Sequence, residues 1–153
     1  MYTTNFIYQA PAGVLESLKR LFSVLQQEGL NFQQAASATD NRQLKETLTQ
    51  FLQESKQYIN ELKCQIESLG GNPEMDAALS QIPADAGDLK ISDEKEVYEY
   101  CSKCENRILV AYREILNQSV ILKELRGMVR YQLNGLLCSF LQFKILKDSF
   151  QRI

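Results

Sequence analysis

The chain has 153 residues, a formal net charge of −2 and no histidine. Its length suits one domain with a core of useful size, so we expect residues 1–153 to form a single domain. Because the charge is nearly balanced, it indicates neither nucleic acid nor an acidic surface as a binding partner. The lack of histidine excludes Ser-His-Asp triads and the common His-based acid–base schemes.

The N-terminus has no basic start followed by a long apolar run, so no signal peptide is predicted. The longest apolar run, residues 136–146, is interrupted by polar side chains. It is shorter than the roughly 20 apolar residues that span a bilayer. We therefore expect a soluble cytoplasmic protein that binds no membrane and keeps its four cysteines as free thiols.

The chain is expected to begin with a loose arm over residues 1–12 and a first helix over residues 13–38. Asp40 and Asn41 then predict a tight turn, and either side chain could cap the next helix. Such a short link between two long helices predicts that they lie antiparallel.

Residues 42–71 predict the clearest helix of the chain. Apolar residues recur there at steps of three and four, which places one apolar stripe along one side. Gly70 and Gly71 should end this helix, because glycine tolerates the left-handed conformation of a helix cap.

Residues 72–91 predict a long connection, since prolines, a glycine and several aspartates interrupt them. One short helix is expected near residues 74–81. About twenty residues far exceed a hairpin turn and could run the length of a bundle when extended. A third helix is then predicted over residues 92–117, with Ser92 or Asp93 as its cap.

A fourth helix is predicted from about residue 120 to residue 150, and it is apolar around much of its circumference. No strand-like alternation is found, so the predicted fold is all-α, an antiparallel four-helix bundle. The expected core consists of the large members of the four stripes: Leu18, Leu21, Phe22, Leu25, Phe32, Leu44, Leu48, Phe51, Tyr58, Leu62, Ile66, Leu69, Val97, Tyr98, Ile108, Tyr112, Ile115, Leu116, Leu122, Leu125, Val129, Leu136, Phe140, Phe143 and Leu146.

Each predicted helix interrupts its stripe near the middle with a polar residue. These residues are Glu28, Ser55 with Glu54 beside it, Glu105 and Gln132. Counted from the turns at about 1.5 Å per residue, their heights agree within about one helical turn. The sequence therefore predicts a polar layer across the middle of the bundle.

Buried carboxylates are costly unless they are paired or bind a cation. Glu28, Glu54 (or Glu61) and Glu105 could therefore be the remains of a metal site. A carboxylate-bridged di-iron site takes a Glu from each of two helices and a Glu-x-x-His from each of the other two. Both paired motifs are broken in this chain, which has no histidine. The alternative is that Glu28 and Glu105 hydrogen-bond to neighbouring tyrosine, serine or amide groups, or lean out to water.

The segments EGLNFQQAA, ELKCQIESLGGNP and CENRILVAYREIL, with the region around Gln132, resemble an uncharacterised bacterial family of ferritin-like four-helix proteins. The resemblance covers residues 14–150 and implies a ferritin-like bundle with a long crossover between helices 2 and 3. It also implies a degenerate metal site, because the family's histidines in the last helix and the crossover are missing here. The resemblance assigns Glu28, Glu61 and Glu105 to positions that could still act as ligands.

Cys101 and Cys104 have the spacing of a redox or metal dithiol, and Cys64 and Cys138 could complete a four-thiol zinc site. A ferritin-like crossover would place Cys64 at the opposite end from Cys101 and Cys138. That topology predicts no four-thiol site. Inert core thiols, a zinc site and a redox pair remain the three interpretations.

Two functions follow from these observations. The first is a non-catalytic structural or interaction protein with no cofactor, which would form a homodimer through its apolar last helix. The second is a ferritin-like protein that binds or oxidises iron, or binds manganese, at an all-carboxylate di-metal site. The sequence indicates no nucleic-acid partner under either hypothesis.

Overall fold

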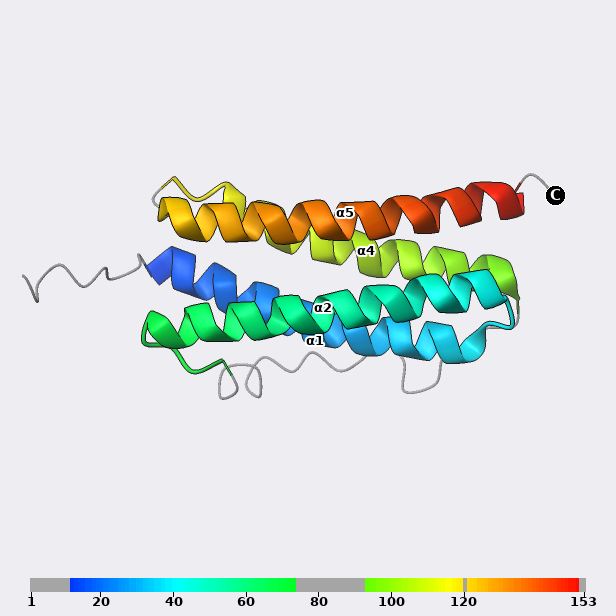
Figure 1. Ribbon diagram of the computed structural model, residues 1–153, viewed down its shortest axis with the longest axis horizontal. Helices are drawn as coiled ribbons and strands as arrows, with labels where there is room; N and C mark the ends of the chain where they lie inside the picture. The colour runs from blue at the N-terminus through cyan, green and yellow to red at the C-terminus, as the bar shows by residue number, and fades with distance from the viewer. Residues whose placement is uncertain (1–11, 74–92, 120, 152–153) are drawn as a thin grey trace, which may run out of the picture.

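A computed structural model describes residues 12–73, 93–119 and 121–151 (Figure 1). These residues form four helices and no strand, which confirms the all-α prediction. The helices are α1 (Ala12–Ala38), α2 (Arg42–Ser68), α4 (Glu94–Leu116) and α5 (Lys123–Gln151). The predicted arm, the short helix near residues 74–81 and most of the predicted crossover lie outside the described residues.

The ends of α2 follow from the residues predicted to form them. Of the two candidate caps, Asn41 is the N-cap, and its side chain accepts a hydrogen bond from the backbone N of Leu44 at 3.1 Å. At the other end Gly70 has φ +87°, a left-handed conformation that glycine adopts without strain. The backbone N of Gly71 then donates to the carbonyl of Ile66 at 2.9 Å, which closes the helix in a Schellman arrangement.

The third helix is capped by Asp93, which accepts a hydrogen bond from the backbone N of Glu96 at 2.9 Å. At its far end, Arg126 of α5 donates to the carbonyls of Leu116 and Gln118 at 3.0 and 2.9 Å. The last carbonyls of a helix have no partner within it, so this arginine satisfies two acceptors at the α4 end.

Each of the four described helices packs against two of the others. Helix α1 packs against α2 and α4, and α5 packs against the same two helices. Figure 1 shows α1 and α5 running in one direction and α2 and α4 running in the other. The loops at 39–41 and 117–122 therefore join neighbouring helices.

Most of the buried apolar side chains belong to the predicted stripes. Val14, Cys104 and Ala111 are buried outside them, and the predicted stripe residues Leu69, Leu116 and Leu146 are only partly buried. Leu122 is 38% exposed, because α5 begins only at Lys123 and Leu122 belongs to the preceding link. Aromatic rings connect three helices across the core. The ring centroids of Phe32 and Phe51 lie 4.4 Å apart, and those of Phe51 and Phe140 lie 5.5 Å apart. Among the helices described, none is long and apolar enough to cross a membrane.

Candidate functional site

The carboxylate of Glu28 is buried between α1 and α4 and binds an arginine. Arg107 donates from Nε to Oε2 at 2.7 Å and from Nη2 to Oε1 at 3.0 Å. Asn31, one turn along α1, donates from Nδ2 to Oε1 at 2.9 Å. Glu28 is only 4% exposed, so its charge is balanced within the protein by a two-pronged guanidinium contact.

The two cysteines of the CxxC pattern are buried in the core, and Cys104 lies beside this ion pair. Burial raises the pKa of the Cys101 thiol to about 12, and the nearby Glu105 and Glu94 charges act in the same direction. Burial, followed by the charge of Glu28, also raises the pKa of the Cys104 thiol. A reactive cysteine requires a lowered pKa and access to solvent, so the structure favours the interpretation of these residues as inert core thiols.

A second polar group lies where α2, α4 and α5 meet. Gln132 of α5 is fully buried, and its Oε1 accepts a hydrogen bond from the Tyr112 hydroxyl at 2.9 Å. Its Nε2 donates to Glu61 Oε1 at 2.9 Å and to the carbonyl of Tyr58 at 3.3 Å. The amide thus satisfies both its oxygen and its nitrogen, and it holds three helices in register.

About two turns along α5 from Gln132, α2 and α5 make a further contact through Glu54. Ser139 donates to Glu54 Oε1 at 2.9 Å, and the Tyr58 hydroxyl is hydrogen-bonded to the same carboxylate. Burial raises the pKa of the Tyr58 hydroxyl, and the Glu54 charge raises it further. A Cβ atom on Gly135 would collide with the Tyr58 hydroxyl, so this position requires glycine.

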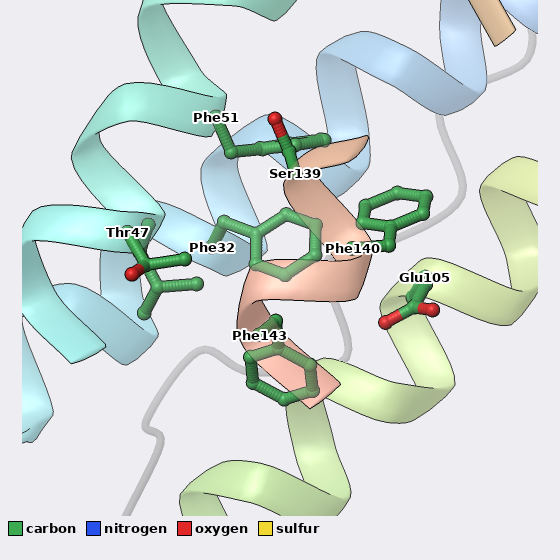
Figure 2. Close-up of a pocket in the computed structure, with 8 residues that line it drawn as sticks. Phe32, Thr47, Phe51, Glu105, Ser139, Phe140 and Phe143 are labelled. Atoms are coloured by element: carbon green, nitrogen blue, oxygen red, sulfur yellow. The ribbon is translucent and has the colours of Figure 1, made fainter. Parts of the chain in front are cut away.

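Glu105 lies near the contact between Glu54 and Ser139, because Ser139 lines the same pocket. Residues of all four helices line this small, mainly apolar pocket, and they include Phe32, Phe51 and Phe140 (Figure 2). Burial raises the pKa of the Glu105 carboxyl to about 7, although the charges of Lys147 and Lys144 oppose the shift. The group is therefore poised to change its charge close to neutral pH.

The four carboxylates predicted as ligands lie in different surroundings. Glu28 binds Arg107, Glu54 and Glu61 contact neutral donors of α5, and Glu105 faces phenylalanine rings. Within residues 12–73, 93–119 and 121–151, no three His, Cys, Asp or Glu side chains are grouped so that they could hold a metal ion. The described residues therefore do not fit a carboxylate-bridged di-metal centre.

The predicted equal heights hold for Glu28, Glu54 and Glu105 and not for Gln132. Glu28 meets α4 at Cys104 and Arg107, on either side of Glu105 in the sequence, and Glu54 binds Ser139, which lines a pocket with Glu105. Glu105, however, lies level with Ser139 and Phe140, whereas Tyr112 lies level with Gln132. By these contacts, α5 lies about two turns further along α4 than the counted heights predicted.

Sequence reasoning missed Arg107 and Ser139 as partners of the buried polar groups. Arg107 follows Cys104 by three residues, so helical spacing already places it beside the apolar stripe of α4. A basic residue at the border of a stripe was the available signal for the Glu28 ion pair. The sequence carries no comparable signal for the clash that makes Gly135 necessary.

Comparison with known protein families gives one finding. The family model described as Domain of unknown function (DUF2383) matches residues 13–118. The match takes in α1, α2 and α4 and stops before α5, so the region of Gln132 lies outside it. Comparisons with curated proteins and with solved structures gave no match.

Proposed function

The chain belongs to the DUF2383 family, and from that premise we propose that it is a non-catalytic structural or interaction protein built on a ferritin-like bundle with a degenerate metal site. The helix directions support the ferritin-like part of the proposal. Figure 1 shows α2 and α4 running the same way, and each described helix packs against two antiparallel neighbours. This arrangement is the one expected of a bundle with a long crossover between its second and third helices.

One observation, the ion pair between Glu28 and Arg107, supports the proposal that the metal site is degenerate. A carboxylate that serves a metal must offer an oxygen lone pair to the cation, and its neighbours must supply further ligands. Both oxygens of Glu28 accept hydrogen bonds from Arg107, and one also accepts from Asn31. The guanidinium thus supplies the positive charge that a buried carboxylate requires.

The surface of α5 supports an interaction role. Apolar side chains on this helix remain open to solvent in the single chain: Tyr131 is 62% exposed, Leu137 42%, Leu141 56% and Ile145 50%. A helix that is apolar on its core face and on its outer face needs more cover than one bundle provides. A homodimer through α5 supplies that cover, in a single-domain cytoplasmic protein.

The alternative is a ferritin-like protein with an all-carboxylate di-metal site that binds or oxidises iron, or binds manganese. The observation that favours it is the group of oxygen atoms between α2 and α5, where the donors to Glu54 and Glu61 are neutral among the residues that the structure describes. Elemental analysis of the full chain, purified without added metal, separates the two functions. We expect far less than one iron or manganese per chain, and a melting temperature that neither a chelator nor added Fe²⁺ changes.

A matched pair of variants makes this test specific. Near-stoichiometric iron or manganese that disappears in Glu54→Gln/Glu61→Gln, and persists in Glu46→Gln/Glu67→Gln, would overturn the proposal and establish the alternative. The second variant removes two exposed carboxylates from the same helix, so it controls for net charge. Loss of metal in Glu28→Ala/Glu105→Ala would instead place the cation at the α4 side.

A further inference from the structure

On the outer face of α5, opposite the core face, exposed residues recur at a regular spacing. Their positions alternate by three and four residues and comprise Tyr131, Asn134, Cys138, Leu141, Ile145 and Asp148, which we call the α5 seam. All six are exposed. The buried positions of the same helix, such as Val129, Leu136 and Phe143, lie on the opposite side. Such an average spacing of 3.5 residues is what two helices need to pack along each other.

Charges at the two ends of the α5 seam specify a direction for the second helix. Arg130 and Asp148 are both exposed and lie 148 − 130 = 18 residues apart, about 27 Å along the helix. Their midpoint is residue 139, between Cys138 and Leu141 in the centre of the seam. An antiparallel copy would therefore place Arg130 opposite Asp148 at both ends, whereas a parallel copy would place like charges together.

Resting on the interaction function proposed above, we infer that the occupant of the α5 seam is a second copy of this chain. It packs antiparallel about a two-fold axis near residue 139, so that Cys138 of one copy lies beside Leu141 of the other. A two-fold contact is self-complementary, which is why one arginine and one aspartate suffice for two ion pairs. The antiparallel register also places Asn134 opposite Ile145 of the second copy.

The mass of the full chain in solution is the first test. Sedimentation should give a dimer, and Leu141→Ser should weaken it at least tenfold, because the change removes an apolar contact on both sides of the axis. Leu30→Ser on α1 is the matched control, since Leu30 is 54% exposed and far from the seam residues in sequence. A monomer, or a dimer that Leu141→Ser and Leu30→Ser affect equally, would overturn the inference.

Disulfide trapping tests the direction. In a Cys64→Ser/Cys138→Ser background the remaining thiols, Cys101 and Cys104, are buried. Chains carrying Asn134→Cys mixed with chains carrying Ile145→Cys should form a disulfide-linked dimer on oxidation. Neither variant should do so alone, because about 16 Å separates residues 134 and 145 along the helix. Trapping by Asn134→Cys alone would reveal a parallel pair and overturn the antiparallel arrangement.

Charge exchange provides an independent check. Arg130→Glu and Asp148→Arg should each weaken the dimer, and the two together should restore it. Lys56→Glu on the exposed face of α2 should leave the dimer unchanged. The metal measurement keeps this inference separate from the proposed function. A metal-free monomer would overturn only the inferred dimer. A chain that carries metal would overturn the proposed non-catalytic function, whether it is a monomer or a dimer.

Discussion

The α1–α4 interface and the α2–α5 interface both bury carboxylates near the middle of the bundle, and they neutralise them differently. Between α1 and α4, Glu28 is closed off by the charged side chain of Arg107. Between α2 and α5, Glu54 and Glu61 accept hydrogen bonds from a serine, a tyrosine and an amide. The depth of burial explains the difference, since Glu28 is almost fully buried and the other two are only partly so.

The α1–α4 interface therefore requires a counter-charge more strictly than the α2–α5 interface does. A fully buried carboxylate without a counter-charge is far costlier than a half-exposed one, because water can still solvate the latter. Substitutions at Arg107, Gly135, Tyr112 and Glu105 test this difference.

Replacing Arg107 should be the most damaging change. Arg107→Met leaves Glu28 buried without its cation, which should lower the free energy of unfolding by about 3–5 kcal/mol. Urea denaturation measures the loss. The double variant Glu28→Met/Arg107→Met should recover most of it, because the uncompensated charge is then gone. A loss below about 1 kcal/mol in Arg107→Met would show that the ion pair has no structural weight.

Filling the space at Gly135 should be the next most damaging change. In Gly135→Ala the new methyl group meets the Tyr58 hydroxyl, and overpacking of this kind costs about 1–3 kcal/mol. Tyr58→Phe removes the colliding oxygen, so Tyr58→Phe/Gly135→Ala should be more stable than Gly135→Ala alone. Gly127→Ala is the control, because no atom lies within 4 Å of a Cβ at that position.

Removing the Tyr112 hydroxyl, which lies on the α4 side of Gln132, should lower the stability moderately. Tyr112→Phe removes the donor to Gln132 Oε1, which is then buried without a partner, at a cost of about 1–3 kcal/mol. Thermal and urea unfolding measure the change. If Tyr112→Phe were as stable as the wild type, the amide would have to find another donor.

The smallest effect should be the pH dependence due to Glu105, because this side chain is only partly buried and water screens its charge. The folded protein holds this proton up to about pH 7, whereas the unfolded chain releases it near pH 4.5. Stability is therefore lost as the pH rises between these values, since the unfolded state then binds fewer protons. Glu105→Gln should flatten this part of the stability profile and should be favoured over the wild type more at pH 8 than at pH 4.

Urea midpoints at pH 4, 6 and 8 measure this slope. Glu99→Gln, at an exposed position of the same helix, serves as the control and should leave it unchanged. A parallel profile for the wild type and Glu105→Gln would mean that water reaches the Glu105 carboxyl freely.

Local signals were enough to predict most of the helical structure. The stripe of α2 became its buried face, Asn41 and Asp93 became caps, and Gly70 ended α2. These features depend on the spacing of apolar residues and on backbone groups close in the sequence. The start of α5 was predicted three residues too early, because nothing in the apolar pattern marks the non-helical link before Lys123.

The chain by itself determined that four amphipathic helices form and that polar residues interrupt each apolar stripe, since helical spacing is a property of sequence alone. Which polar groups meet depends on how the helices pack. Arg107 reaches Glu28 across 79 positions of the chain, and Gln132 reaches Glu61 across 71. Those pairings depend on how far each helix slides and turns against its neighbour, and a shift of one residue turns a side chain by about 100°.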